Sequence, residues 1–469
     1  MTTVTRTEID FLGPMEVPAD AYWGVQTARA IENFPITGQK ISNMPNLIRA
    51  LAHIKKAAAS VNSELGAISS AHARAIVQAC DEIVAGQLHD QFVVDVIQGG
   101  AGTSTNMNAN EVIANRGLEL MGFARGRYDM LHPNDHVNAS QSTNDVYPTA
   151  LRLAAWTGIG RLLQALAGLR EAFDQKAKAF ENILKIGRTQ LQDAVPMTLG
   201  QEMLAYAVML GEDEQRLSEA RALMLEVNLG ATAIGTGINA PAGYAKNVVD
   251  RLAQYSGVPV VASPNLVEAT QDTGAFVQLS GVLKRIACKL SKIANDLRLL
   301  SSGPQAGLGD IFLPARQAGS SIMPGKVNPV IPEVVNQVAY EVIGNDLMIT
   351  MASESGQLQL NAFEPVMGWA LTNSIEHLTN ACNTFQHHCV RGIEANTALL
   401  ARRVAESVTL VTALNPIIGY EKAARIAKTV LQEGGTIAEV ADRLGILKKE
   451  DVEALLVADT LTRPAALRS

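Results

Sequence analysis

The 469-residue sequence is poor in cysteine, in aromatic residues and in charged residues. It has four cysteines, 4% aromatic residues and 18% charged residues. Four cysteines are too few for a disulfide scaffold and are typical of a protein from a reducing compartment. Hydrophobic residues make up 47% of the chain, which excludes an intrinsically disordered protein, because disorder requires low hydrophobicity and high net charge. We therefore expect a folded protein of about three structural units.

The sequence also lacks an excess of positive charge and a long uninterrupted hydrophobic run. Its 39 basic and 46 acidic residues give a net charge of −7, and no nucleic-acid partner is expected because phosphate binding needs a basic surface. The N-terminal residues do not have the basic region and apolar core of a signal peptide. The most apolar span, 151–169, is interrupted by Arg152 and Arg161, each of which is costly inside a bilayer. We expect a soluble cytoplasmic protein that does not enter a membrane.

The aliphatic residues are regularly spaced. In the range 276–300 they recur at alternating steps of three and four, which places one apolar stripe along a long helix. The long helices predicted from such stripes, or from runs of strong helix formers, cover 159–173, 201–226, 276–300, 330–355 and 371–389. They indicate a bundle of about five helices at roughly 150–395. Because stripes of this length are covered better by helices of other subunits than within one monomer, we expect an oligomer.

The regions on either side of the predicted bundle differ from it. Residues 1–145 mix short helical segments with turns rich in proline and glycine, and residues 396–469 are typical of a small helical appendage. We predict an all-α protein of three domains: an N-terminal mixed, mainly helical domain (1–145), a central helix bundle (146–395) and a small C-terminal helical domain (396–469).

Four polar segments punctuated by glycine interrupt the aliphatic chain. They are GGAGTSTNMNANE (99–111), NASQSTND (138–145), GRTQLQDAVP (187–196) and QAGSSIMPGKVNP (317–329). Their hydroxyl, amide and backbone N–H groups are donors that suit carboxylate oxygens. Ordinary capped turns use the same residue types, so each segment alone leaves both interpretations open. Convergence of the four segments at one site is a hypothesis.

Other familiar sites are disfavoured. The segment 319–327 is similar to a phosphate-binding loop, but Val327 stands where Ser or Thr would bind magnesium. Cys382 and Cys389 lie on an apolar helical stripe, so we interpret them as core residues rather than zinc ligands. The HPND segment (132–135) is open to two interpretations, a secondary anion site and a capped turn. The GxSxG motif of a hydrolase is absent from the sequence.

The segment GSSIMPGKVNP (319–329) resembles the signature loop of the fumarase/aspartase superfamily. GGAGTSTNMNANEVIAN (99–115) and SQSTNDVYPTA (140–150) resemble its two other characteristic blocks, in the expected order. The similarity extends from about Arg6 to Pro416. It implies three domains with a central five-helix bundle, and a homotetramer that packs these bundles into a twenty-helix core. It also implies active sites that are shared by three subunits.

Within the superfamily the sequence is most similar to the aspartase branch, through GRTQLQDAVPMTLGQE (187–202) and EVNLGATAIGTGIN (226–239). Fumarases usually have histidine where Gln190 stands and a second serine where Thr143 stands. The implied reaction is the reversible anti elimination of ammonia from L-aspartate, which gives fumarate through an aci-carboxylate intermediate. The resemblance implies no organic cofactor, no metal ligands in the site, and Mg²⁺ at most as an activator.

The resemblance also assigns roles to individual residues. It makes Ser320 the general base that removes the proton. The carboxylate that becomes the aci-carboxylate would be bound by Thr103, Ser142, Thr143 and Ser321. The amine would be bound by Asn144, with Thr103 and Gln190 as further candidates. The other carboxylate would be bound by Thr189, Lys326 and Asn328. Gly319 and Gly325 would let the loop close as a lid over the substrate.

Two alternatives to the ammonia-lyase stay open. One is a class II fumarase-like hydratase that acts on malate and fumarate, which Gln190 argues against. The other is a catalytically idle structural protein of the same fold, as some lens crystallins are. The sequence departs from the family pattern at Gln305, where arginine is usual, and at Ala362 and Phe363, where Val-Met is common. These departures bear on the exact substrate, not on the elimination chemistry.

Overall fold

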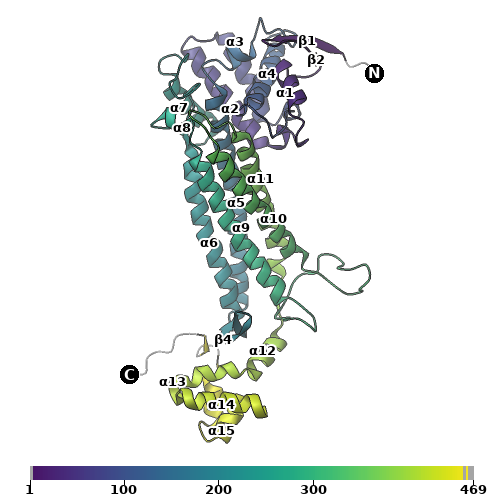
Figure 1. The fold of residues 1–469 in the computed structure, drawn as a ribbon, viewed down its shortest axis with the longest axis vertical. Helices are drawn as coiled ribbons and strands as arrows, with labels where there is room; N and C mark the ends of the chain where they lie inside the picture. Colours follow the sequence, from purple (N-terminus) through teal and green to yellow (C-terminus); the bar gives the residue numbers. More distant parts are fainter. Residues whose placement is uncertain (1–3, 458–460, 463–469) are drawn as a thin grey trace. The chain divides into compact units, whose positions relative to one another are not determined.

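The computed structural model describes residues 4–457 and 461–462. Five helices of 24 to 37 residues dominate it (Figure 1). They are α5 (Thr143–Ala179), α6 (Leu199–Ala222), α9 (Gly274–Leu300), α10 (Val330–Glu354) and α11 (Glu364–His388). Each coincides with a range in which the sequence predicted a long helix. The predicted all-α fold class and the five long helices are therefore confirmed.

Helix α9 shows why these segments are helical. Its apolar stripe consists of Phe276, Leu279, Leu283, Ile286, Leu290, Ile293, Leu297 and Leu300. Every one of these side chains is at most 6% exposed. Burying a side chain of this size stabilises the folded state by about 1.5–3 kcal/mol relative to leaving it in water. The stripe, rather than intrinsic helix propensity, is therefore what holds this long helix in place.

The chain folds into two compact units. Unit 1 consists of the described residues within Met1–Leu163, Gln215–Ala287 and Tyr340–Thr379. Unit 2 consists of the described residues within Gln164–Glu214, Cys288–Ala339 and Asn380–Ser469. All five long helices contribute residues to both units. The predicted division into three domains, at residues 145 and 395, stays a prediction.

In unit 1 the long helices are joined by buried polar contacts. Ser280 on α9 donates to Asp346 on α10 at 2.8 Å, and Asn345 on α10 donates to Ser374 on α11 at 3.1 Å. The other elements are β1 (Thr5–Asp10) antiparallel to β2 (Gly13–Pro18), β5 (Glu226–Val227) parallel to β6 (Val261–Ala262), and helices α1 (Val25–Asn33), α2 (Pro45–Glu64), α3 (Ser70–Val84), α4 (Thr103–Leu120), α7 (Tyr244–Ser256) and α8 (Leu266–Ala269).

In unit 2 aromatic rings pack between the long helices. Phe173 on α5 lies edge to face against Tyr206 on α6 and Phe385 on α11. The other elements are β3 (Leu184–Thr189) antiparallel to β4 (Gln192–Thr198), β7 (Ile311–Phe312) antiparallel to β8 (Glu394–Ala395), and helices α12 (Thr397–Glu406), α13 (Asn415–Ile418), α14 (Tyr420–Glu433), α15 (Ile437–Arg443) and α16 (Lys449–Leu455).

The short C-terminal helices have a core of their own. Leu414, Ile426, Ile437 and Val452 are all nearly inaccessible and pack together. Helix α15 begins with a capping box, in which the side chains of Thr436 and Glu439 each accept the other's backbone N–H. The separate core agrees with the predicted helical character of this region. Among the helices of the described residues, none is long and apolar enough to cross a membrane.

Candidate active site

Thr103, the first residue of α4, follows a glycine turn. Gly100 and Gly102 both have positive φ angles. A Cβ on Gly102 would lie 2.4 Å from the ring of Tyr147, so only glycine fits this position. The Thr103 hydroxyl donates to the backbone oxygen of Gly100 at 2.7 Å, and the side chain is exposed. The turn thus places the exposed Thr103 side chain at a helix N-terminus, where a negatively charged ligand is favoured.

Ser142 directly precedes α5, and Thr143 and Asn144 are the first two residues of that helix. Ser142 Oγ accepts the Asn144 N–H at 3.2 Å, and Asn144 Nδ2 donates to the backbone oxygen of Ala233 at 2.8 Å. Thr143 Oγ1 accepts a hydrogen bond from Asn106 Nδ2 at 3.1 Å. Because Asn106 lies in the first turn of α4, this bond places the Thr103 turn beside the start of α5. Within unit 1, the structure therefore brings these four predicted residues into one region.

Two buried charges support this region, and the sequence assigned them no role. Asp145 is fully buried, and its carboxylate accepts the N–H groups of Ser142 at 2.9 Å, Gly230 at 2.9 Å and Thr232 at 3.1 Å. Burial raises the pKa of Asp145 to about 6, although these hydrogen bonds and the charge of Lys55 oppose the rise. The one sequence feature that pointed to a role for Asp145 was its position in the polar segment 138–145.

Lys55 on α2 is the second of these charges. Its Nζ donates to Asn138 Oδ1 at 2.8 Å, and Asn106 Nδ2 donates to the same oxygen at 3.2 Å. Burial lowers the pKa of Lys55 to about 7, because a charged ammonium is poorly solvated there. The sequence around Lys55 is an ordinary amphipathic helix, so nothing in it indicates a buried cation.

In unit 2, Thr189 and Gln190 lie at the tip of the β3–β4 hairpin. Thr189 pairs with Gln192, and the two residues between them, Gln190 and Leu191, have φ angles of 54° and 62°. Two left-handed residues make the tight turn that matches the twist of a two-stranded hairpin. Thr189 and Gln190 are both exposed, so their polar groups are available to a ligand.

The loop at 319–328 is closed by its own hydrogen bonds. The Gly319 N–H donates to the backbone oxygen of Lys326 at 2.8 Å, and Asn328 Nδ2 donates to the backbone oxygen of Gly319 at 3.0 Å. A Cβ on Gly319 would lie 2.3 Å from that Lys326 oxygen. Ser320 Oγ accepts the N–H groups of Ile322 at 3.2 Å and Met323 at 3.0 Å. The loop thus directs two backbone donors at the Ser320 oxygen.

The ten predicted site residues fall into three local groups. Thr103 and residues 142–144 belong to unit 1, whereas the hairpin turn and the 319–328 loop, which includes Ser321, Lys326 and Asn328, belong to unit 2. Among the hydrogen bonds of the described residues, none joins the hairpin turn to this loop. The convergence of all ten residues at one site therefore stays a prediction.

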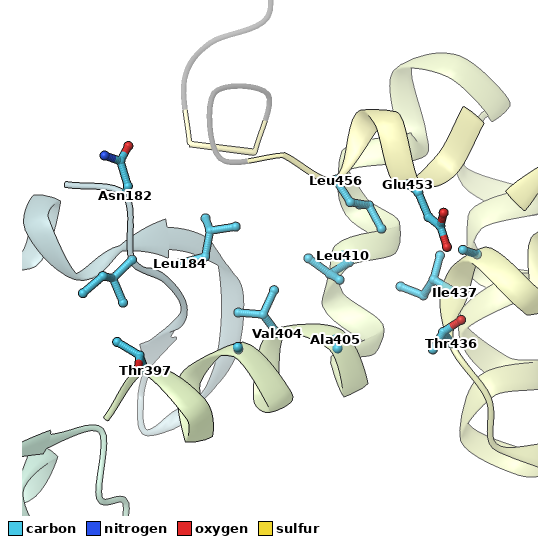
Figure 2. Close-up of a pocket in the computed structure, with 13 residues that line it drawn as sticks. Asn182, Leu184, Thr397, Val404, Ala405, Leu410, Thr436, Ile437, Glu453 and Leu456 are labelled. Atoms are coloured by element: carbon cyan, nitrogen blue, oxygen red, sulfur yellow. The ribbon is translucent and has the colours of Figure 1, made fainter. Parts of the chain in front are cut away.

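A large cavity in unit 2 does not have the chemistry of the predicted site. It has a volume of about 590 Å³ and lies between the start of β3, helix α12 and the C-terminal helices (Figure 2). Leu184, Val404, Leu410, Ile437 and Leu456 are among its lining residues. Its lining residues in the described part of the chain include Glu453 but no lysine or arginine. A dicarboxylate would lose its hydration there without gaining a counter-charge, so this cavity is not the candidate site.

The described residues do not include a group of three or more His, Cys, Asp or Glu side chains arranged to hold a metal ion. Cys382 is fully buried and Cys389 is 1% exposed. Burial raises the pKa of both thiols to about 12, which disfavours the thiolate form that binds zinc. These observations agree with the interpretation of both cysteines as core residues. Residues 4–457 and 461–462 thus offer no such set of ligands to a resident divalent cation.

A buried carboxyl at the start of α11 makes stability depend on pH. Burial raises the pKa of Glu364 from about 4.5 to about 8, while the charge of Arg152 partly opposes the rise. Because the native state holds this proton more tightly than the unfolded state, the free energy of unfolding falls as the pH rises from about 5 to about 8. Glu364→Gln cannot titrate. We expect its Tm, relative to the unchanged protein, to be several degrees higher at about pH 9 than at about pH 6.

Thermal unfolding followed by circular dichroism at both pH values measures this difference. Glu354→Gln, which alters an exposed carboxyl at the end of α10, is the control and should give the same Tm difference at both pH values. Equal Tm differences for Glu364→Gln at the two pH values would contradict the assignment.

Comparison with protein families gives two matches. A family model described as "Lyase" matches residues 13–344, and one described as "Fumarase C C-terminus" matches residues 410–463. An aspartate ammonia-lyase of Pseudomonas canavaninivorans is 56% identical over 460 residues, which cover 98% of this chain and 97% of the relative. An aspartate ammonia-lyase of Escherichia coli K12 is 53% identical over 466 residues, which cover 99% of this chain and 98% of the relative.

Two solved structures with the same fold carry different descriptions. A protein from Brucella melitensis, described as fumarate lyase:delta crystallin bound to cobalt, superposes with a TM-score of 0.95 at 57% identity, covering 98% of this chain and 99% of that one. A class II fumarase from Schistosoma mansoni superposes with a TM-score of 0.93 at 35% identity, covering 99% of this chain and all of that one. The fold is thus shared with a class II fumarase and with a protein described as fumarate lyase:delta crystallin.

Proposed function

This chain belongs to the lyase family within the fumarase/aspartase superfamily, and on that premise we propose that it is an aspartate ammonia-lyase. The proposed reaction is the reversible anti elimination of ammonia from L-aspartate, which gives fumarate and ammonium. The identity of 53–56% to aspartate ammonia-lyases over nearly the whole chain supports this choice, as does the lower identity of 35% to the fumarase.

The difficult step of this reaction is removal of a proton from the carbon next to a carboxylate. The electron pair of the broken C–H bond moves into that carboxylate, which becomes an aci-carboxylate with two negative charges. The extra electron pair of the aci-carboxylate then forms the double bond of fumarate while the carbon–nitrogen bond breaks. The nitrogen keeps the electron pair of that bond and leaves as ammonia, which takes up the proton that the base removed and becomes ammonium. Catalysis must therefore stabilise a negative charge that develops only after the substrate has bound.

Ser320 is the proposed base, and its environment is the observation that carries the mechanism. A serine hydroxyl is too weakly acidic to act as a base unless its alkoxide is stabilised. The two backbone N–H groups of Ile322 and Met323 already donate to the Ser320 oxygen, and an alkoxide would accept both more strongly than a hydroxyl does. Closing of the glycine-flanked loop over the substrate would exclude water and strengthen these bonds further.

The substrate-binding roles divide between the two units. In unit 1, Thr103, Ser142 and Thr143 are the proposed donors to the aci-carboxylate, together with Ser321 of unit 2. Asn144 is the proposed contact of the amine, with Thr103 and Gln190 as further candidates. Thr189, Lys326 and Asn328 of unit 2 are the proposed ligands of the other carboxylate. Lys326 is the one full positive charge in this predicted set, so it supplies the main electrostatic attraction for a dianionic substrate.

The proposed assembly is a homotetramer in which three subunits share each active site. A stripe on α10, here called the α10 stripe, consists of Tyr340, Ile343, Leu347 and Met351. Its spacing of three and four residues places it along one helix face, and Leu347 and Met351 are each 62% exposed in the single chain. An apolar stripe of this kind on a monomer marks a protein interface. It supports packing of the bundle against other copies.

The proposed enzyme works without an organic cofactor, and Mg²⁺ is at most an activator. No catalytic step is assigned to a metal, because the described residues offer it no set of ligands. We place the enzyme in the cytoplasm, in agreement with its four free cysteines. Its proposed partners are the dicarboxylate substrate and other copies of the chain, with neither nucleic acid nor a membrane.

The proposed function is tested by following the absorbance of the fumarate double bond. Purified protein receives L-aspartate in one cuvette and L-malate in another. We expect absorbance to rise with aspartate alone, with an equal amount of ammonium released. A rise with malate alone would make the protein a fumarase-like hydratase. No rise with either substrate would favour the structural protein or, given Gln305 and Phe363, a different amino-acid substrate.

A further inference from the structure

A buried aspartate outside the predicted site gathers three cations in unit 2. Asp310 is 0% exposed. Its carboxylate accepts two hydrogen bonds from Arg188, at 2.7 and 3.3 Å, and one from Arg403, at 2.5 Å. Lys185 Nζ lies 3.3 Å from the same carboxylate and 2.7 Å from that of Glu202. A buried ion cluster of this kind is costly to desolvate and contributes little net stability compared with apolar packing.

The path of β3 is altered so that two of these cations reach Asp310. Lys185 and Arg188 are three residues apart, and in a regular strand such residues face opposite sides. The β3–β4 register shifts between Ile186 and Arg188, which is the effect of a β-bulge. The bulge lets both side chains face the same carboxylate. It is also where a Cβ on Gly187 would lie 3.1 Å from the Met197 sulfur and 3.2 Å from the Val195 oxygen.

The backbone N–H and the backbone oxygen of Asp310 are both hydrogen-bonded to other elements. Its N–H donates to the backbone oxygen of Leu300, the last residue of α9, at 2.8 Å, and its oxygen accepts the Asn396 N–H at 3.0 Å. Asn396 caps the N-terminus of α12, the helix that carries Arg403. Hydrogen bonds thus hold the backbone of Asp310 in place. Arg188, which binds the Asp310 carboxylate, is the residue directly before the Thr189–Gln190 turn.

We propose that Asp310 is a positioning residue for substrate binding: through Arg188 it fixes the direction of the Thr189–Gln190 turn, and through Arg403 it connects that turn to α12. The proposal rests on the proposed function, in which Thr189 binds a substrate carboxylate. Two roughly parallel bonds between a guanidinium and a carboxylate fix both distance and direction. The turn begins one residue beyond Arg188, so its orientation follows that of the guanidinium anchor.

The Asp310 carboxylate, which anchors Arg188, stays negatively charged at neutral pH, and its bonds to Arg188 depend on that charge. Burial alone would raise the pKa of Asp310, but hydrogen bonding by Arg188 and the charges of Lys185 and Arg188 outweigh burial and lower the pKa. Arg188 and Arg403 also border a cavity of about 380 Å³. If the carboxylate were lost, the Arg188 side chain would have room to turn away from its present position, and the turn would lose its anchor.

The experiment compares Asp310→Asn and Asp310→Glu with the unchanged enzyme. KM and kcat for L-aspartate are measured together with the dissociation constant of succinate, an unreactive dicarboxylate, by calorimetry. For Asp310→Asn we expect KM and the succinate dissociation constant to rise by about tenfold, with kcat reduced by less than about threefold. Asp310→Glu keeps the charge and should restore most of the affinity. The control is Glu214→Gln, which removes another ion pair of unit 2, with Arg170, and should leave KM unchanged.

Three results would overturn the proposal: unchanged KM and succinate affinity in folded Asp310→Asn, an equal rise in KM for Glu214→Gln, or a fall in kcat alone. If Asp310→Asn does not fold, Arg403→Gln removes a single, partly exposed contact, and we expect about a threefold rise in KM. Unchanged affinity in that variant would count against the proposal in the same way. If the protein without substitutions were inactive on L-aspartate, that result would contradict the proposed function instead. The dissociation constant of succinate would still show whether Asp310 affects dicarboxylate binding.

Discussion

Ser320→Ala is expected to lower kcat for L-aspartate by about a thousandfold or more while leaving the oligomer intact. A positioned general base contributes about 10²–10⁴-fold to a rate, and alanine removes the oxygen to which the Ile322 and Met323 N–H groups donate. Turnover is measured by fumarate absorbance, and the oligomeric state by light scattering after size exclusion.

A matched control separates loss of the base from loss of a loop hydrogen bond. Ser407 Oγ accepts the N–H of the residue two positions later, Thr409, at 3.3 Å, as Ser320 Oγ does with Ile322 at 3.2 Å. Ser407→Ala should keep kcat within about twofold of the unchanged enzyme. If Ser320→Ala were to retain a comparable kcat, Ser320 would not be the base, and another group would have to remove the proton.

The second large effect is expected from the α10 stripe. The double variant Leu347→Glu, Met351→Glu places two charges where the proposed tetramer buries apolar side chains, and burying unpaired charges is strongly unfavourable. We expect the tetramer to dissociate at micromolar concentrations. Because the predicted site residues are proposed to come from three subunits, activity should fall by about a hundredfold or more. Light scattering and fumarate absorbance on the same samples measure both effects.

The control for this prediction is Leu431→Glu on α14. Leu431 is 72% exposed, more than either stripe residue, so the substitution has the same chemistry at a position outside the α10 stripe. It should leave the tetramer and the activity unchanged. If the double variant stays tetrameric, the stripe is not an interface. If it dissociates and remains fully active, the active site lies within one subunit.

The sequence was sufficient for the features that depend on local pattern. The stripe from Phe276 to Leu300 predicted α9 because a period of three and four residues is itself the geometry of a helix. The same reasoning placed the other long helices, and the buried Cys382 agrees with its position on such a stripe. The motif at 319–329 pointed to the superfamily because its glycines, serines and lysine occur at fixed spacing in one short segment.

The tertiary structure decided how the buried charges are paired. Asp145 accepts the Gly230 N–H across 85 residues of sequence, and Asp310 binds Arg188 across 122 residues and Arg403 across 93. Apart from the polar segment that contains Asp145, the sequence near these aspartates does not distinguish them from solvent-exposed ones, because the partners that satisfy a buried charge come from other elements. The sequence by itself therefore determined the helices, the superfamily and the reaction it implies. Only the tertiary structure decided which charges are buried behind the predicted site residues, because desolvation and its compensation depend on groups that the chain brings together from far apart.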